Sequence, residues 1–245
     1  MKLGISLSKV SFAYQKSKPV LKSISYDIKP GSFLAIAGNN GSGKSTLTLL
    51  LNGLIPHQIQ GDFSGQVLID SISTASKPVS FFAFKVGLVF QNPDFSIFNL
   101  TVKEELMFGL KNLKTPHPNQ RINRALSQVN MTKYLNHDPQ SLSYGQKQKI
   151  CLATILALNP DYLVLDEPTA MLDHRSSLEL YEILKQLNQQ GKTIIVVEHH
   201  LDLIKKYSSQ TLILDQGKII ASGQTKSVLT KTKLLNQLGL SSWSL

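Results

Sequence analysis

Residues 38–45, GNNGSGKS, constrain this chain more than any other stretch of its sequence. The string follows an apolar segment with strand character at 33–37 and precedes a segment with helical spacing at 47–54. In that context a G-x-x-x-x-G-K-S string indicates a phosphate-binding loop, because its glycines let backbone N–H groups converge on phosphates at the start of a helix. The candidate phosphate contacts are Gly38, Asn39, Asn40, Gly41, Ser42, Gly43, Lys44 and Ser45.

The end of this loop suits a nucleotide that carries magnesium. Lys44 brings a point charge to the phosphates, and the Ser45 hydroxyl is a ligand that Mg²⁺ accepts. Thr46 is either a further hydroxyl beside the phosphates or simply a residue of the first helical turn.

A second element is the apolar strand YLVL at 162–165, which ends in two adjacent carboxylates. Such a pair is repulsive at a buried strand end unless a cation is bound. Asp166 suits a magnesium contact, and Glu167 suits the polarisation of a water that attacks a γ-phosphate. The alternative is a solvated strand end without a bound cation.

A third element, LSYGQ at 142–146, precedes the strongest helical pattern, 144–158. Ser143 and Gln146 form an S-x-x-Q capping box, so a helix is expected to begin here. A helix N-terminus favours anions, which makes Ser143, Gly145 and Gln146 candidates for phosphate contact. The pentapeptide by itself is equally typical of an ordinary cap.

Composition indicates a compact globular protein. The chain has 245 residues, of which 42% are hydrophobic and 17% charged, which excludes collagen-like, low-complexity and coiled-coil classes. The single Cys151 allows no disulfide within the chain and no cysteine-based zinc cluster, so we expect a reducing compartment and a small core residue. No apolar run approaches the ~18 residues that span a bilayer, and the first residues lack a signal-peptide core.

The charge balance favours anionic partners without choosing among them. The formal net charge is +10, from 26 Lys and Arg against 16 Asp and Glu. Nucleic acid, nucleotide phosphates, an acidic membrane surface and a merely solvated lysine-rich surface all fit this excess.

The order of the segments predicts an α/β fold with a mostly parallel sheet flanked by helices. Strand-like runs alternate with helical segments, except that a block from 101 to about 158 is helical throughout and looks like an insertion. The expected strands are 5–14, 20–28, 33–37, 66–70, 86–90, 162–165, 193–197, 211–214 and 218–221.

Taken together, GNNGSGKS, LSYGQ and YLVLDE resemble the nucleotide-binding domain of ATP-binding cassette (ABC) proteins over nearly the whole chain. The resemblance implies ATP hydrolysis with ATP and Mg²⁺. It also implies a P-loop NTPase fold with a RecA-like sheet, an N-terminal antiparallel β subdomain and a helical signature subdomain. One domain would span 1–245, with its core and β subdomain at about 1–92 and 158–230, the helical subdomain at about 93–157 and a short tail at 231–245.

The same resemblance assigns roles to single residues. Tyr14 matches the aromatic residue that stacks on adenine, and Asp173 matches the D-loop aspartate. Gln91 matches the Q-loop glutamine and His199 the switch histidine, so the implied catalytic group is Glu167, His199 and Gln91. The implied metal ligands are Ser45, Gln91 and Asp166.

Each of these residues has an alternative interpretation. Tyr14 also suits core or sheet-edge packing, Gln91 suits a turn before Asn92, and His200 is the alternative to His199. The sequence departs from the family pattern at Tyr144, where the signature most often has glycine, and at Met171 in the D-loop.

In ABC proteins ATP lies between the phosphate loop of one subunit and the signature of the other, so one cassette implies a second ABC ATPase subunit, identical or paralogous. Chromosome-maintenance ATPases need a very long coiled-coil insertion, and twin-cassette translation factors carry both cassettes in one chain. Only a small helical insert fits between 45 and 142. No nucleic-acid partner is therefore expected.

Two stretches, QNPDFSIFNLTV at 91–102 and VEHHLD at 197–202, resemble the ATPase subunits of energy-coupling factor (ECF) importers, including cobalt- and nickel-type systems. This implies a subunit at the cytoplasmic face of the membrane that powers uptake of a vitamin or transition-metal ion. Its implied partners are a transmembrane coupling subunit and a small substrate-binding membrane subunit. Another importer class, or a nucleic-acid or ribosome-associated ABC ATPase, is the alternative.

Three apolar residues of the first stretch, Ile97, Phe98 and Leu100, look exposed and would line a groove for a coupling helix, or else form the core of the insert. Lys147 and Lys149 are candidates for the exposed face of the signature helix. The tail contains the apolar residues Leu234, Leu235, Leu238 and Trp243. They would form either a dimer contact or a helix packed on the chain's own domain.

Overall fold

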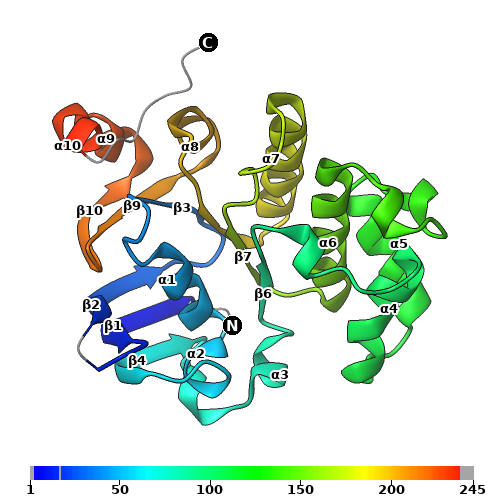
Figure 1. Cartoon of the computed structure of the whole chain (residues 1–245), viewed down its shortest axis with the longest axis horizontal. Helices are drawn as coiled ribbons and strands as arrows, with labels where there is room; N and C mark the ends of the chain where they lie inside the picture. Colours follow the sequence, from blue (N-terminus) through cyan, green and yellow to red (C-terminus); the bar gives the residue numbers. More distant parts are fainter. Residues whose placement is uncertain (1–2, 17, 238–245) are drawn as a thin grey trace.

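A six-stranded sheet crosses the middle of the molecule in the order β10-β9-β3-β8-β7-β6 (Figure 1). The computed structural model describes residues 3–16 and 18–237. The strands from β9 to β6 are parallel, and β10 pairs antiparallel with β9. Their bounds are β3 Phe33–Ala37, β6 Val86–Val89, β7 Tyr162–Asp166, β8 Thr193–Val197, β9 Gln210–Asp215 and β10 Lys218–Gln224.

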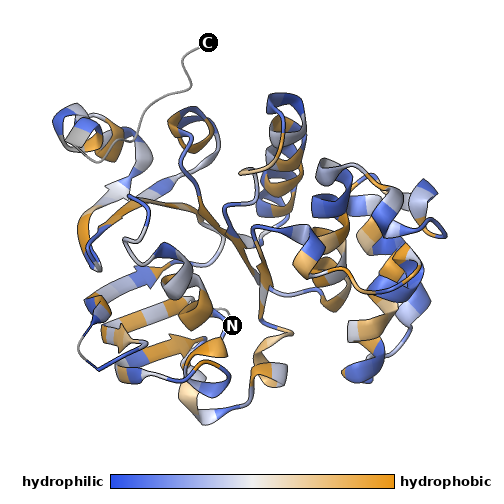
Figure 2. Ribbon diagram, in the orientation of Figure 1, coloured by the Kyte–Doolittle hydropathy of each residue, from blue (hydrophilic) through white to orange (hydrophobic). Residues whose placement is uncertain are grey.

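This sheet is buried on both faces, which explains why its central strands are short, uninterrupted apolar runs. Side chains alternate between the faces of a strand, so β3 places Phe33 and Ala35 in one hydrophobic core and Leu34 and Ile36 in the other. Figure 2 shows apolar residues concentrated in the strands. The sheet therefore separates two cores.

A second sheet, antiparallel in the order β2-β1-β4-β5, packs on one of these cores. Its strands are β1 Ile5–Ala13, β2 Pro19–Ile28, β4 Asp62–Ile69 and β5 Ile72–Ser73. The predicted α/β class with an antiparallel β subdomain is confirmed. Strand β4 begins at Asp62, earlier than the predicted position 66, because Asp62 and Ser64 pair with β1 although their stretch carries little apolar pattern.

The helices α4 (Val102–Asn112), α5 (Pro118–Gln128) and α6 (Tyr144–Leu158) pack together at one end of the molecule (Figure 1). Their buried residues, among them Leu106, Leu126 and Ile150, join the core on the adjacent face of the six-stranded sheet. The remaining helices are α1 Lys44–Leu51, α2 Leu54–His57, α3 Val79–Phe82, α7 His174–Gln189, α8 Leu201–Tyr207, α9 Thr225–Leu229 and α10 Thr232–Gln237. Short 3-10 turns lie at Thr74–Ser76, Pro93–Phe95, Thr132–Tyr134 and Pro139–Ser141.

The topology gathers four loops at one edge of the six-stranded sheet. Strands β3, β8, β7 and β6 are consecutive parallel neighbours, so their carboxyl ends meet there. The loop at 38–45 follows β3, Gln91 follows β6, Glu167 follows β7 and His199 follows β8. In open α/β sheets this edge is where ligands bind.

Three sequence expectations need correction or fall outside the described residues. Ile97 is buried and belongs to the core, whereas Phe98 and Leu100 are exposed as expected. Lys147 is also buried, because it pairs with Asp94. The tail residues Leu238 and Trp243 lie outside the described residues, and Leu235 is buried.

Within residues 3–16 and 18–237, none of the helices combines the length and apolar character that crossing a membrane requires. Cys151 is buried, as expected for a small core residue, and burial raises the pKa of its thiol to about 12. The thiol is therefore protonated at neutral pH.

Candidate nucleotide site

The loop at 38–45 joins β3 to α1, and close packing requires glycine at 38 and 43. A side-chain carbon at Gly38 would collide with the carbonyl oxygen of Leu214 on β9. Gly43 has φ +104°, which favours glycine, and α1 begins directly after it at Lys44. The loop borders a pocket of about 390 Å³ that Gln91 and Glu167 also line. A phosphate chain placed here meets a helix N-terminus.

Lys44 lies between the start of the loop and the acidic strand end. Its Nζ donates to the carbonyl oxygens of Gly38 (3.0 Å) and Asn39 (2.9 Å) and lies 4.0 Å from Glu167 Oε1. Burial lowers the pKa of Lys44, and the charges of Glu167 and Asp166 oppose that shift. The ammonium is thus held at the pocket by the loop after β3 and by the residue that follows β7.

Asp166 is a half-buried carboxylate next to Ser45. Burial raises its pKa and so does the charge of Glu167, whereas a hydrogen bond from Ser45 lowers it. Among the described residues, Asp166 Oδ1 is a buried oxygen without a hydrogen-bond partner. Buried polar atoms without a partner are few in native proteins, so this oxygen suits a bound cation.

The oxygen set of Ser45 and Asp166 fits Mg²⁺, which prefers oxygen ligands and usually takes only one or two from protein beside those of phosphates and water. Among the described residues, no group of three or more His, Cys, Asp and Glu side chains is placed to hold a metal ion by itself. A cation here would therefore depend on the nucleotide for further ligands.

Glu167 contacts side chains from two neighbouring strand ends. Its Oε1 lies 2.8 Å from His199 Nε2, and its Oε2 accepts a hydrogen bond of 3.3 Å from Gln91 Nε2. The backbone of Glu167 is left-handed, with φ +47°, directly after β7. The hydrogen bond with His199 lowers the pKa of Glu167, against the effect of burial, so its carboxyl is ionised at neutral pH. The ring that contacts Glu167 is that of His199, one of the two neighbouring histidines.

Sequence reasoning missed Glu198, which holds His199 in place. This carboxylate is 2% exposed and accepts four hydrogen bonds. Its Oε2 accepts from Thr169 Oγ1 (2.7 Å) and Tyr181 Oη (2.8 Å), and its Oε1 accepts from the backbone N–H groups of His199 (2.8 Å) and His200 (3.0 Å). The available signal was an acidic residue directly after an all-apolar strand.

Tyr14 presents an aromatic ring beside the loop. The side chain is 48% exposed, packs edge-on against Phe12 with ring centroids 4.9 Å apart, and shares a hydrogen bond of 3.1 Å between its hydroxyl and Thr46 Oγ1. Thr46 is buried and therefore fixes the ring of Tyr14. An accessible flat ring at this place suits the stacking of a base.

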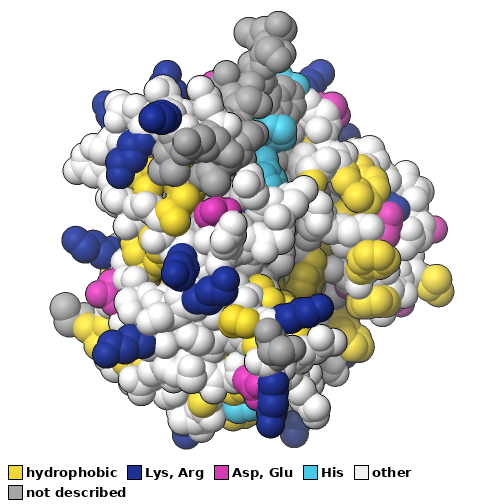
Figure 3. Space-filling view, turned by 60° about the vertical axis from the view of Figure 1, so that its left-hand side comes forward, with side chains coloured by type: hydrophobic (Ala, Val, Ile, Leu, Met, Phe, Trp, Pro, Cys, Tyr) yellow, Lys and Arg dark blue, Asp and Glu magenta, His cyan; other side chains and the backbone are white. Residues whose placement is uncertain are grey.

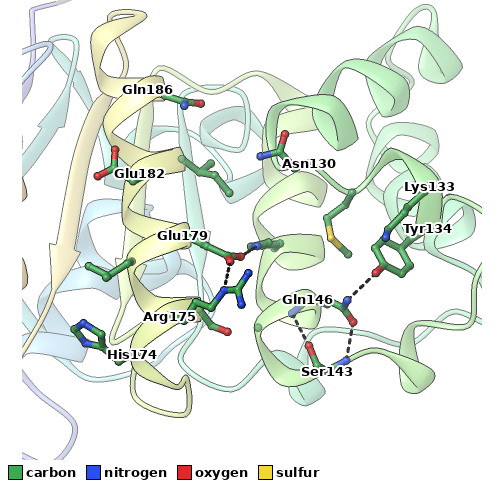
Figure 4. Close-up of a pocket in the computed structure, with 16 residues that line it drawn as sticks. Asn130, Lys133, Tyr134, Ser143, Gln146, His174, Arg175, Glu179, Glu182 and Gln186 are labelled. Carbon is green, nitrogen blue, oxygen red and sulfur yellow. Dashed lines mark hydrogen bonds and ion pairs between the residues drawn. The ribbon is translucent and has the colours of Figure 1, made fainter.

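Ser143, Gly145 and Gln146 lie elsewhere, at the start of α6. The predicted capping box is confirmed: Ser143 Oγ accepts from the Gln146 N–H (3.4 Å), and Gln146 Oε1 accepts from the Ser143 N–H (2.9 Å). These residues line a groove of about 820 Å³ between α6 and α7 (Figure 4). A side-chain carbon at Gly145 would lie 3.0 Å from Ser176 Oγ, so glycine permits the close approach of α7.

Asp173 caps α7 in the same part of the molecule. Its carboxylate accepts from the Ser176 N–H (2.8 Å) and from Ser176 Oγ (2.9 Å), and these hydrogen bonds lower its pKa. The structure thus brings together the loop at 38–45, Gln91, Asp166, Glu167 and His199. The signature residues line a different cavity.

A phosphate loop, an acidic strand end and a separate capped helix define a class of P-loop ATPase. The sequence model described as "ABC transporter" matches residues 21–170, more than half of the chain. This chain therefore belongs to the ABC transporter family and is an ATP-binding subunit of that family. ABC ATPases bind ATP, hydrolyse it for transport, form cassette dimers and pair with transmembrane subunits.

Two relatives illustrate how far the similarity extends. A provisionally named ABC transporter ATP-binding protein of Pyrococcus horikoshii is 41% identical over 240 residues, which cover 96% of this chain and 84% of the relative. The energy-coupling factor transporter ATP-binding protein EcfA1 of Lactobacillus acidophilus is 38% identical over 241 residues, which cover 97% of this chain and 84% of the relative.

Solved structures agree with this assignment. The structure of cbiO1 from Clostridium perfringens, part of the ABC transporter complex cbiONQ, superposes with a TM-score of 0.84 at 29% identity, covering 98% of this chain and 96% of that one. The dimeric structure of a bacterial ABC transporter cassette superposes with a TM-score of 0.77 at 28% identity, covering 90% and 98%.

Proposed function

We propose that this chain is the ATP-hydrolysing subunit of an ECF-type importer for a vitamin or a transition-metal ion and acts in a dimer of cassettes at the cytoplasmic face of the membrane. The observation that carries the proposal is the separation of Ser143 from the pocket of Lys44 and Glu167. A second subunit would supply the missing signature to each pocket. The dimeric cassette and the similarity to EcfA1 and cbiO1 support this reading.

In this proposal each residue of the pocket has a defined role toward ATP. Residues 38–45, Lys44 among them, bind the phosphates. Tyr14, whose hydroxyl is held by Thr46, stacks on the adenine. Ser45 and Asp166 hold Mg²⁺, with Gln91 adjoining it. Bound Mg²⁺ supplies charge neutralisation at the β- and γ-phosphates.

Glu167 orients the attacking water and accepts its proton, because its carboxyl is ionised and lines the same pocket as the loop. His199 and Gln91 fix the carboxylate from two sides. The partner's Ser143, Gly145 and Gln146 would complete the phosphate site, with the Asp173 segment adjoining it.

An apolar surface on the helical part suits a membrane partner. Phe95, Phe98, Leu100 and Phe108 are all more than half exposed. A pocket of about 290 Å³ opens beside them, lined by Phe90, Phe95, Ile97 and Phe98. Exposed apolar side chains around a groove are typical of a site for an amphipathic helix. We assign it to the transmembrane coupling subunit, which in turn carries the small substrate-binding membrane subunit.

Nucleic acid is not part of the proposal. Among the side chains drawn in colour in Figure 3, Lys and Arg are scattered over that face between neutral and acidic ones. A nucleic-acid-binding surface would need them gathered along one groove.

The test is purification of the tagged chain from detergent-solubilised membranes. We expect two membrane proteins to co-purify with it, and ATPase activity that requires the dimer. The variant Phe98→Asp should lose these membrane proteins yet keep the ATPase activity of the isolated dimer, and Phe81→Asp, on α3, is the matched control. Co-purification of ribosomes, or stimulation by DNA with no membrane subunit present, would contradict the proposal.

A further inference from the structure

One face of α6 contacts the segment that contains Gln91. Tyr144, Lys147, Gln148 and Cys151 follow the spacing of three and four residues that places side chains on one side of a helix. All four lie against residues 90–94, the end of β6 and the turn after it. This segment is more than fifty positions away in the sequence, so the contact is purely tertiary.

Tyr144 contributes the contact nearest to the nucleotide residues. Its hydroxyl donates to Asn92 Oδ1 (2.9 Å), the same oxygen that accepts the Asp94 N–H and so caps the turn Pro93–Phe95. Tyr144 directly follows Ser143, and Asn92 directly follows Gln91. A glycine at 144 would leave Asn92 Oδ1 without this bond.

Lys147 and Gln148 extend the contact along the helix. Lys147 Nζ donates to Asp94 Oδ1 (2.7 Å), and the side chain of Lys147 is 11% exposed whereas that of Asp94 is 40% exposed. Gln148 Nε2 donates to the carbonyl oxygen of Phe90 (3.3 Å). Both contacts join α6 to residues 90–94.

We propose that Tyr144, Lys147 and Gln148, here called the α6 clamp, fix residues 90–94 to the first turns of α6. Gln91 and Ser143 of one chain then move together. Tyr144 and Lys147 are positioning residues in this view: they act through Gln91 and Ser143 and touch no nucleotide. The inference rests on the proposed cassette dimer, in which Gln91 serves the chain's own nucleotide and Ser143 the partner's.

The α6 clamp and a purely local role of Tyr144 in the signature predict different results. A broken clamp in one subunit should slow both sites of a dimer, its own site through Gln91 and the opposite site through Ser143. A purely local role would slow only the opposite site.

The experiment uses mixed dimers with separable tags. Glu167→Gln in one subunit silences the site of that subunit, so one active site is left. Tyr144→Phe is then placed either in the subunit with intact Glu167 or in the subunit with Glu167→Gln. We expect kcat of the remaining site to fall about threefold to tenfold in both arrangements, as for the loss of one hydrogen bond. Tyr26→Phe, a hydroxyl deletion on β2, is the matched control and should leave kcat unchanged.

A second pair of variants checks the ion pair. Lys147→Met and Asp94→Asn should each lower kcat with little change in Tm, because Asp94 is partly exposed and becomes hydrated. The double variant should be no slower than the slower single variant.

The clamp is refuted if Tyr144→Phe slows only the site facing the altered subunit or slows neither, or if the effects of Lys147→Met and Asp94→Asn multiply. Failure of the proposed function looks different: the unaltered chain would then hydrolyse ATP equally well as a monomer, or a dimer with one Glu167→Gln subunit would lose no activity.

Discussion

The pocket around Lys44 and the start of α6 differ in how their polar groups are held. In the pocket, Glu167 contacts side chains from two other strand ends, and Asp166 keeps an oxygen without a partner. At the start of α6, Ser143 and Gln146 satisfy each other within a single turn. The pocket is thus assembled by long-range contacts. The cap at the helix start is closed within one turn, and Gln146 Nε2 also donates to Tyr134 Oη (2.8 Å).

The reason for this difference is architectural. Parallel strands align their carboxyl ends, so residues far apart in sequence meet at one edge. The helices α4 to α6 form a separate group beside the sheet (Figure 1), and the start of α6 lines a different cavity from the pocket of Lys44. The comparison predicts that substitutions in the pocket act on chemistry within the chain, whereas a substitution of Ser143 acts across a dimer.

The largest expected effect is that of Glu167→Gln. The amide keeps the shape but is a poor proton acceptor, so hydrolysis should fall by about 10²–10⁴ while ATP still binds and the closed dimer accumulates. Single-turnover hydrolysis and size-exclusion chromatography with ATP measure both. Glu104→Gln, on the surface of α4, is the control, and near-normal hydrolysis by Glu167→Gln would remove Glu167 from the chemistry.

Ser143→Arg should inactivate the homodimer without unfolding it, because the arginine would clash with the nucleotide of the facing subunit. In a mixed dimer with one altered subunit, the facing site should be lost and the other retained, so the rate should fall to about half. Steady-state ATPase of tagged mixed dimers measures this. A full rate in the mixed dimer would contradict the shared sites and remove the basis of the comparison.

A smaller effect is expected for Glu198, which positions His199 without facing the pocket. Glu198→Ala leaves two buried hydroxyls and two backbone N–H groups without their partner, each costing about 1–3 kcal/mol, and should lower both kcat and Tm. Glu198→Gln keeps an acceptor and should recover most of kcat. Equal kcat for the two variants at a temperature where both are folded would show that Glu198 has no influence on His199.

The smallest expected effect is that of Asp166→Asn on thermal stability, which should differ in sign between the nucleotide-free protein and the protein with ATP and Mg²⁺. Because burial raises the pKa of Asp166, its charged form is disfavoured in the folded chain. This cost is absent below the pKa of the unfolded chain and present in full above the raised pKa. Asp166→Asn should therefore raise Tm of the nucleotide-free protein, by about 2–4 °C for each kcal/mol gained, and diminish the stabilisation by ATP with Mg²⁺. A lower Tm of Asp166→Asn without ligand would contradict the assignment of Asp166 as a cation ligand.

Glu167 provides the contrasting sign within the same pocket. Its pKa is lowered by the hydrogen bond with His199, so its contribution to stability is present above the pKa of an unfolded glutamate and is lost as the pH falls through the lowered value. The pKa values of these two adjacent carboxyl groups are thus shifted in opposite directions. The difference comes from their burial and from their hydrogen-bond partners.

The sequence by itself determined what is local in this protein. The glycine-rich loop and the capping box of Ser143 and Gln146 are patterns of neighbouring residues, because a turn and a helix start are specified within a few positions. The alternation of apolar runs and helical segments likewise determined the α/β class. These features need no knowledge of distant contacts.

Only the tertiary structure decided which charged residues are buried, because their partners are remote in sequence. Lys147 was expected on an exposed face, but its side chain is buried and its Nζ pairs with Asp94, fifty-three positions away. Glu198 is buried as well, and it accepts hydrogen bonds from Thr169 and Tyr181, which are 29 and 17 positions away. A buried charge is tolerated only where specific partners meet it, and those partners are chosen by the path of the chain in space. No local pattern records that path.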